Sequence, residues 1–374
     1  MKFTCLKESL AKYLTIVSRN VSTKATLPVL SNIYLQAKDG RIKMAATNLD
    51  TGVTVWIGAK VEEEGELTIP AKQFQEFINS LPAEKIECKT EEQKLYITCG
   101  HYSAVIHGIV ASEFPPIPTS EEKPTIKISA KEFLKAVNQV AYAAATDEGR
   151  PVLTGVSCLF SDGKLSLAAT DGYRLSVKEL GVGKMEKAQS SLILPAKSLL
   201  EVAHIVQDIE GSGEEIAITV TPKSNQVIFS LKEVELVTRL IEGQFPDYQK
   251  IIPTSHTTTA TIDTEEFLHA VKVASIFARD SANVAKLQFQ KEGHPIQLMA
   301  NSAQVGENKT VMDAAVEGEE NEIAFNTRYL IDFLGSISDK QVRFEMSGPK
   351  KAALFKPVKD ETLLHIIMPI RVSE

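Results

Sequence analysis

The sequence predicts an α+β protein made of three repeated domains, each with two helices packed on antiparallel sheet. The first observation is that short motifs recur in the same order, about 125 residues apart. The second is that each copy alternates between helical and strand-like hydrophobic periodicity. The third is a pair of stretches rich in proline and polar residues, which separate the copies.

The repeat is defined by motifs whose offsets agree. Pro70-Ala71-Lys72 recurs as Pro195-Ala196-Lys197, and the segment 44–48 (MAATN) recurs as 167–171 (LAATD). These offsets are 125 and 123 residues. The third copy is weaker, with Asn326-Thr327-Arg328 in the Pro-Ala-Lys position. Because the motifs keep their order, we interpret them as copies of one structural unit.

Three domains follow from this register, with boundaries at 1–120, 126–250 and 254–374. The segments 114–124 and 245–259 carry prolines and polar residues, which is typical of connectors.

The first helix of each later domain begins at a helix-capping pattern. Ser129 and Asp263 are each followed three residues later by a glutamate, Glu132 and Glu266, and then by an apolar stripe. A serine or aspartate there can accept hydrogen bonds from the first free N–H groups. The second helix is expected to follow the Pro-Ala-Lys position.

Strands are expected between the two helices. The runs 165–168 and 174–177 are apolar, and the Asp171-Gly172 pair between them is a strong hairpin signal. The equivalent runs in the first domain are 43–46 and 53–57.

Composition excludes several classes of protein. The chain is 43% hydrophobic and 24% charged, so it can bury several cores and is not disordered as a whole. It has no run of roughly 18 apolar residues, and its first residues lack the apolar core of a signal peptide. We therefore expect a cytoplasmic protein without a membrane partner.

The four cysteines do not form a redox or metal motif. Cys5, Cys88, Cys99 and Cys158 are widely spaced, so we expect buried, reduced thiols. The seven histidines are scattered, and the sequence contains no phosphate-binding loop or metalloprotease motif. It therefore predicts no metal and no cofactor.

The best catalytic candidate is the segment with Asp171 and Arg174. An aspartate beside an arginine can form an acid–base site. The simpler interpretation is a tight Asp-Gly turn with Arg174 on the next strand, and we favour it because no nucleophile or paired carboxylate accompanies the segment.

Basic residues recur on the polar faces of the expected helices, although the net charge is −7. Lys72, Lys197 and Arg328 occupy one repeat position near the start of the second helix, where a cation opposes the helix dipole. A threefold pattern of this kind favours a surface that meets a polyanion through its phosphates, without sequence preference. The residues that follow the pattern are Lys12, Arg19, Lys72, Lys131, Lys135, Lys197, Lys272, Arg279 and Arg328.

The whole chain resembles one family, the bacterial DNA polymerase III beta subunit, or DNA sliding clamp. The motifs that carry the resemblance are LPVLSNIYLQ (27–36), AATDGYRL (168–175), FPDY (245–248) and IIMPIR (366–371). The resemblance implies that the three domains are of the DNA-clamp type and that a head-to-tail homodimer closes a six-domain ring around duplex DNA. It also implies a nucleoid-associated protein that binds double-stranded DNA independently of sequence. Helices would line the hole, and sheets would form the outer shell.

In that family a short peptide of each partner docks in an apolar pocket. The partners are the polymerase catalytic subunit, the clamp loader and repair proteins. The resemblance implies that the pocket here contains Leu153, Thr170, Gly172, Tyr173, Arg174, Leu175, Pro246, Ile251, Ile366 and Met368. Aliphatic walls with a few polar groups suit this task.

The resemblance also assigns residues outside the pocket. Lys24 and Arg150 lie on loops expected to face DNA, and Ala104, Ile276 and Phe277 fall at the dimer interface.

Three functions are therefore compatible with the sequence. The first is a non-catalytic processivity factor of the DNA polymerase III holoenzyme, active in replication and repair. The second is an enzyme with an active site around Asp171 and Arg174 on a repeat scaffold. The third is a general protein-binding scaffold with no DNA role.

Overall fold

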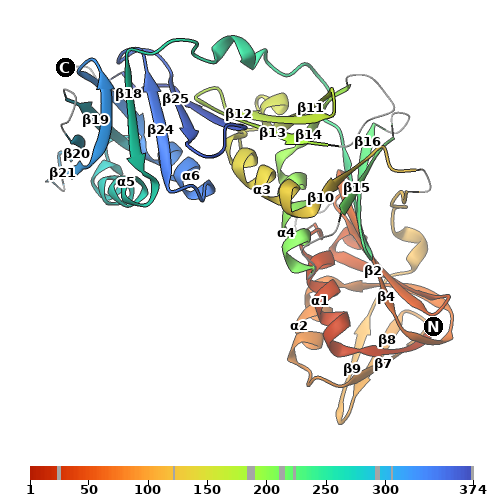
Figure 1. Cartoon of the computed structure of the whole chain (residues 1–374). Coiled ribbons are helices and arrows are strands. Elements are labelled where there is room, and N and C mark those ends of the chain that lie inside the picture. Colours follow the sequence, from red (N-terminus) through yellow and green to blue (C-terminus); the bar gives the residue numbers. More distant parts are fainter. Residues whose placement is uncertain are drawn as a thin grey trace. The chain divides into compact units, whose positions relative to one another are not determined.

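The computed structural model describes residues 1–22, 27–120, 123–182, 190–209, 215–221, 225–290, 295–304 and 306–371. These residues form two compact units. The main segments of the first are Met1–Lys131 and Glu201–Leu240, and those of the second are Glu132–Val182 and Ile241–Glu374. Figure 1 shows helices and antiparallel sheets in the chain.

Six α-helices lie in the described residues, two in each repeat: α1 (Lys7–Ser18), α2 (Ala71–Ser80), α3 (Ala130–Val140), α4 (Ala196–Asp208), α5 (Thr264–Ala278) and α6 (Thr327–Ser336). The second helix of each repeat begins within the Pro-Ala-Lys position, at its second residue: Ala71, Ala196 and Thr327. At the start of α5 the Asp263 carboxylate accepts from the Glu266 N–H at 3.0 Å, which is the expected cap.

The first unit contains two antiparallel sheets. The smaller has the order β5-β1-β7-β8-β9, with strands β5 (Lys60–Glu63), β1 (Lys2–Leu6), β7 (Lys85–Glu91), β8 (Lys94–Cys99) and β9 (Tyr102–His107). The larger has the order β10-β15-β16-β17-β4-β3-β2-β6. Its strands are β10 (Ile126–Ser129), β15 (Glu215–Thr221), β16 (Gln226–Leu231), β17 (Val234–Arg239), β4 (Thr51–Gly58), β3 (Arg41–Thr47), β2 (Asn32–Lys38) and β6 (Gly65–Pro70).

The second unit repeats this plan. Its larger sheet has the order β14-β11-β12-β13-β26-β25-β24-β18-β22. The strands are β14 (Ser190–Pro195), β11 (Gly155–Ser161), β12 (Lys164–Thr170), β13 (Arg174–Gly181), β26 (Leu363–Ile367), β25 (Ala353–Pro357), β24 (Gln341–Met346), β18 (Thr258–Asp263) and β22 (Ala314–Gly318). Its smaller sheet has the order β21-β20-β19-β23, with strands β21 (Gly306–Met312), β20 (Ile296–Ser302), β19 (Val284–Phe289) and β23 (Asn321–Asn326).

The sheets join neighbouring repeats. Strand β17 of the second repeat pairs with β4 of the first, and β13 of the second repeat pairs with β26 of the third. The compact units follow these shared sheets, so the second repeat contributes strands to both. Repeats and compact units are therefore two different divisions of the same chain.

Helices pack in pairs on the sheets. In the first unit α1 contacts α2 and the strands β3 and β4, and in the second α5 contacts α6, β19, β20 and β21 (Figure 1). Phenylalanines fill the core of the second unit, where Phe289 and Phe344 stack with ring centroids 4.8 Å apart. Such stacking adds to the stability gained by burying the rings.

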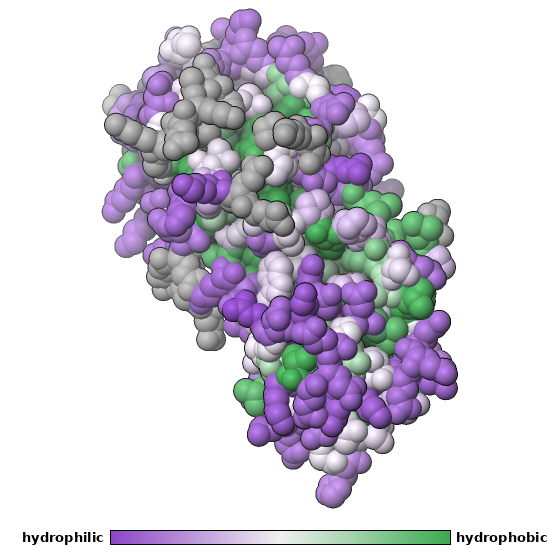
Figure 2. All heavy atoms as spheres, turned by 90° about the vertical axis from the view of Figure 1, so that its right-hand side faces the viewer, coloured by the Kyte–Doolittle hydropathy of each residue, from purple (hydrophilic) through white to green (hydrophobic). Residues whose placement is uncertain are grey.

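The outer surface is mostly polar. Figure 2 shows hydrophilic residues over most of the displayed face, with hydrophobic residues gathered in small groups. This agrees with a chain that has 48 acidic and 41 basic residues. No helix in the described part of the chain is long and apolar enough to cross a membrane.

Candidate functional site

The turn between β12 and β13 is fixed by its own polar side chains. The Thr170 hydroxyl donates to the Arg174 carbonyl at 2.6 Å and accepts from the Gly172 N–H at 3.0 Å. The Asp171 carboxylate accepts from the N–H groups of Tyr173 and Arg174 at 2.8 and 3.0 Å. Gly172 has φ +93°, a region that favours glycine. The Asp-Gly pair therefore forms the expected hairpin turn, and it leaves the Tyr173 side chain exposed.

The Arg174 guanidinium is bonded on several sides. Its Nε donates to Asp171 at 3.1 Å, and one terminal nitrogen donates to the Tyr142 carbonyl at 2.7 Å. The other terminal nitrogen pairs with Asp332 on α6 at 2.5 Å. The guanidinium carbon also lies 4.6 Å from the centre of the Tyr329 ring. Arg174 thus ties the turn of the second repeat to a helix of the third.

An apolar cluster lies on the outer face of the same strands. Leu175 and Ile366 are paired across β13 and β26, and both are almost fully buried. Phe245, Tyr248 and Ile252 of the connector pack against them while staying partly exposed. The other buried members are Ala168, Val177 and Leu354.

Exposed apolar side chains surround this cluster. Tyr173, Ile251 and Met368 are 61%, 47% and 41% exposed, and the Met368 N–H donates to the Tyr173 carbonyl at 2.8 Å. Exposed apolar groups beside a buried apolar floor are typical of a ligand-binding surface.

Most of the residues predicted for the pocket come together. Thr170, Gly172, Tyr173, Arg174, Leu175, Ile366 and Met368 lie on the β12–β13 turn or along β13 and β26. Pro246 and Ile251 are exposed on the connector that supplies Phe245 and Ile252. Leu153 is buried in the 3-10 helix that follows Arg150, and the Arg150 guanidinium donates to the Asp171 carbonyl at 3.0 Å.

The sequence reasoning missed some residues of this site. Phe245 and Tyr248 belong to the FPDY motif, which could have identified them. Tyr142, Tyr329 and Asp332 surround Arg174 only through tertiary packing, and no local signal marks them.

The apolar surface continues into a hollow of about 360 Å³. Val177, Tyr248, Ile252 and Leu364 belong to both the cluster and the hollow. The other residues that line the hollow are Leu159, Ser161, Asp162, Lys164, Ser166, Glu179 and Gln249.

The predicted DNA-facing residues divide into two groups. Lys72, Lys197 and Arg328 are each the second residue of α2, α4 and α6, which confirms that they occupy equivalent positions. They are exposed, as are Lys12, Lys131, Lys272 and Arg279. Among the residues that the structure describes, none of these seven forms an ion pair with a carboxylate.

Two other predicted cations are already paired. Arg19 contacts Glu201 at 2.9 Å and Asp208 at 2.7 Å. Lys135 contacts Asp360 at 2.8 Å. Carboxylates compensate both charges, so they attract phosphate less than the unpaired cations do. Lys24 lies outside the described residues.

The residues predicted for the dimer interface lie near sheet edges. Ala104 is partly buried on β9, the last strand of its sheet, and its neighbour Val105 is 50% exposed. On α5, Ile276 is 57% exposed, whereas Phe277 packs partly against the core. The edge strand β21 carries Val311, which is 54% exposed.

The described residues offer little for catalysis. They contain no group of three histidine, cysteine or acidic side chains arranged to hold a metal. All four cysteines are buried, and burial raises the pKa of the Cys5 and Cys158 thiols to about 12. Such thiols stay protonated and unreactive at neutral pH.

The buried His365 has a packing role. Its Nδ1 lies 2.6 Å from the Ser176 hydroxyl, and its ring stacks on Phe333 with centroids 4.7 Å apart. Burial, together with the nearby charge of Arg174, lowers its pKa well below the usual value, so the ring is neutral. The bonded Asp171 and Arg174 likewise do not support an acid–base site.

Comparisons with known proteins cover the whole chain. Family models of the DNA polymerase III beta subunit match residues 1–118 (N-terminal domain), 127–247 (central domain) and 249–371 (C-terminal domain). A beta sliding clamp from Staphylococcus aureus is 31% identical over 382 residues, which covers 99% of both chains.

Solved structures agree in fold. The DNA polymerase sliding clamp from Bacillus subtilis has a TM-score of 0.93 and 29% identity, with 100% of both chains covered. The clamp from Pseudomonas aeruginosa bound to griselimycin has a TM-score of 0.91 and 27% identity, again with 100% of both chains covered.

Proposed function

The chain belongs to the DNA polymerase III beta subunit family, the bacterial sliding clamps, and we propose that two copies close a ring around duplex DNA. The family is a non-catalytic processivity factor of DNA polymerase III, so the enzyme interpretation is not supported. The observation that carries the proposal is the unpaired cation at the second position of α2, α4 and α6 in all three repeats.

The repeats are proposed to act as three domains, 1–120, 126–250 and 254–374. The pairings β17–β4 and β13–β26 support this arrangement, because each extends one sheet across a boundary between repeats.

Ring closure is proposed to join the edge strand β9 of one copy to β21 of a second copy. An edge strand presents unpaired N–H and C=O groups that can pair with another chain. The exposed Tyr102 and Val105 on β9 and Val311 on β21 would be covered by this pairing. Ala104 is small enough to let Ile276 and Phe277 of the other copy approach.

DNA contact is proposed to be electrostatic and independent of sequence. The exposed cations Lys12, Lys72, Lys131, Lys197, Lys272, Arg279 and Arg328 suit phosphate contacts, together with Arg150. Lys24, which lies outside the described residues, is proposed to contact DNA as well. Weak contacts of this type let a closed ring slide, since closure of the ring retains the DNA. The protein would work in the cytoplasm on the nucleoid.

Partner binding is proposed at the apolar cluster of Leu175 and Ile366. A short peptide from the polymerase catalytic subunit, the clamp loader or a repair protein would lay apolar side chains on this floor. The exposed Tyr173 and Met368 would then be buried against the peptide.

Retention on circular DNA tests the proposal. The protein is loaded by a clamp loader onto nicked circular DNA, the DNA is cut once, and bound protein is measured by gel filtration. A ring should stay on the circle and leave through the ends of the linear molecule. Equal retention on both forms, or a monomer at every concentration in light scattering, would contradict the ring.

A charge-reversal variant tests the DNA-facing residues. Replacing Lys72, Lys197 and Arg328 by glutamate should reduce loading without changing the mass of the dimer. The matched control replaces Lys60, Lys89 and Lys127, which already pair with carboxylates, and should load normally.

A further inference from the structure

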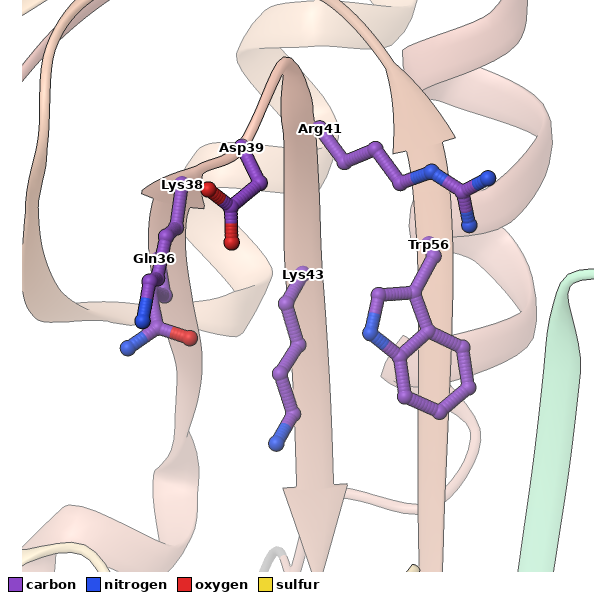
Figure 3. Close-up of a pocket in the computed structure, with 6 residues that line it drawn as sticks. All are labelled: Gln36, Lys38, Asp39, Arg41, Lys43 and Trp56. Carbon is purple, nitrogen blue, oxygen red and sulfur yellow. The ribbon is translucent and has the colours of Figure 1, made fainter.

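A second hollow, of about 250 Å³, lies on the larger sheet of the first unit. Figure 3 shows its side chains on one face of the neighbouring strands β2, β3 and β4, with the Arg41 side chain reaching toward β4 and Trp56. Trp56 is half-buried and is the only tryptophan of the chain. The residues that line this Trp56 hollow are Gln36, Lys38, Asp39, Arg41, Lys43 and Trp56.

Two of its cations have no carboxylate partner within the described part of the chain. Arg41 pairs with Glu233 at 3.5 Å, whereas Lys38 and Lys43 form no ion pair there. Lys43 lies over the Tyr34 ring, with its Nζ 5.9 Å from the ring centre. The nearby Glu66 accepts hydrogen bonds from Tyr34 and Gln36. The residues that line the hollow therefore carry three cations and one anion beside an indole, with Glu233 against Arg41 and Glu235 near Lys43.

The hollow next to the peptide site is its counterpart in the second repeat. Every residue that lines the Trp56 hollow has an equivalent 123 positions later that lines the other: Leu159, Ser161, Asp162, Lys164, Ser166 and Glu179. In both repeats an Asp-Gly turn with positive φ at both residues joins the first two strands. The backbone is therefore the same, and only the side chains differ.

The two hollows differ in charge. The first has three cations and one anion, and the second has one cation and two anions. Trp56 stands where the second repeat has Glu179, and Lys38 and Lys43 stand where it has serines. The chain as a whole is acidic, with net charge −7, so a basic hollow with an aromatic ring differs from the average of its surface.

We propose that the Trp56 hollow binds single-stranded DNA, with one base against the indole and phosphates at Lys38, Arg41 and Lys43. An aromatic ring within a basic groove is the combination that binds single strands without sequence preference. The three strands span roughly 10 Å, which suits a contact of only a few nucleotides. The inference does not rest on ring closure or on the peptide site.

Tryptophan fluorescence gives a direct test, because the only indole lies in the hollow. A thymidine 12-mer is titrated into the protein at low salt, and quenching of the emission is recorded. Three phosphate contacts predict that log K falls with log salt with a slope of about −2. A blunt duplex of the same length should quench far less. The absence of quenching by the single strand at low salt would overturn the proposal.

A double variant separates this site from DNA binding elsewhere. Lys38→Ala with Lys43→Ala keeps Trp56 as the fluorescent reporter and should lower the affinity for the thymidine 12-mer at least about tenfold. The matched control, Lys85→Ala with Lys94→Ala on the other sheet, should bind like the parent protein. Unchanged quenching in the first double variant would contradict the assignment.

Two further measurements complete the test. Trp56→Phe should lower the affinity for a labelled thymidine 12-mer, measured by anisotropy, while the melting temperature confirms folding. A glutamate peptide of equal charge should not quench; if it quenches as strongly, the hollow recognises acidic protein instead, which overturns the proposal. Retention on circular duplex should be unchanged in the Lys38 and Lys43 variant, so failure of this inference and failure of the clamp proposal are distinguishable.

Discussion

The turn between β3 and β4 and the turn between β12 and β13 have equivalent hydrogen bonds between side chains and backbone, but different surroundings. In the first repeat the Thr47 hydroxyl donates to the Thr51 carbonyl at 2.9 Å and accepts from the Leu49 N–H at 3.0 Å. The Asn48 side chain accepts from the Asp50 and Thr51 N–H groups at 3.0 and 2.8 Å. Thr170 and Asp171 make the same bonds in the second repeat.

The side chains after the turn decide what each repeat can bind. Leu175 of the second repeat faces Ile366 and forms an apolar floor. Its counterpart is Gly52, and a Cβ there would lie 3.0 Å from the Ile117 side chain and 3.2 Å from that of Val237. The first connector therefore packs Ile117 against its glycine, whereas the second packs Phe245, Tyr248 and Ile252 against a leucine and leaves these three side chains partly exposed.

This difference shows that equivalent backbone turns in two repeats do not necessarily form equivalent binding sites. Arg174 gathers Asp171, Asp332 and the Tyr142 carbonyl around the second turn. Its counterpart in the first repeat is Thr51, which lacks the reach and charge for such contacts. One fixed arginine, and one apolar floor surrounded by exposed apolar side chains, explain why we assign peptide binding to the second repeat alone.

The largest expected effect follows Arg174→Ala. The change removes three hydrogen bonds and leaves Asp332 without its partner, so affinity for the polymerase catalytic subunit should fall by about 2–3 kcal/mol. Arg174→Lys should not restore it, because an ammonium cannot reproduce the planar fork. Surface plasmon resonance measures this, and Thr51→Ala at the equivalent turn should bind normally. Equal losses in both variants would remove the distinction between the repeats.

A smaller effect is expected from Gly52→Leu, which gives the first repeat the residue of the second. Because Ile117 and Val237 occupy the space, the free energy of unfolding should fall by about 1–3 kcal/mol through overpacking. Gly58→Leu is the control, since nothing lies within 4 Å of a Cβ built there. It should change stability by less than about 0.5 kcal/mol. Urea denaturation distinguishes them, and similar values would mean that the connector does not fill the first site.

The smallest effect at neutral pH concerns the two strand pairings that join neighbouring repeats, β13–β26 and β17–β4. It becomes clear in acid. Lys178 on β13 is buried and bonds Asp360 at 2.7 Å and Thr362 at 2.6 Å, whereas its counterpart on β4 is the apolar Val55. Burial raises the pKa of Asp360, but hydrogen bonds with Lys135, Lys178 and Thr362 outweigh it and hold that pKa well below the usual range.

A lowered folded pKa means that this carboxylate stabilises the protein above about pH 4 and that the stabilisation is lost as the pH falls further. Hydrogen exchange of β13 and β26 should therefore increase in acid more than that of β4 and β17, after correction for intrinsic rates. Asp360→Asn should abolish the excess pH dependence. An equal increase in hydrogen exchange at both strand pairings would show that the Lys178–Asp360 ion pair does not cause the pH dependence.

Much of the fold could be predicted because its signals are local. Periodicity and capping positioned the helices, and the Asp-Gly pair gave the β12–β13 hairpin. Most residues of the peptide site were also found, but through a resemblance to a family. Asp332 and Tyr329 approach Arg174 from a helix about 155 residues away in sequence, so local patterns carry no information about them.

The sequence by itself determined the threefold repeat, the helix starts and the turn chemistry, since each depends on residues a few positions apart. Only the tertiary structure decided that the sheets cross the boundaries between repeats, that Ile117 covers Gly52, and that Arg174 is bonded on all sides. These features depend on which surfaces meet when distant segments pack, and packing selects among side chains that local propensity treats alike.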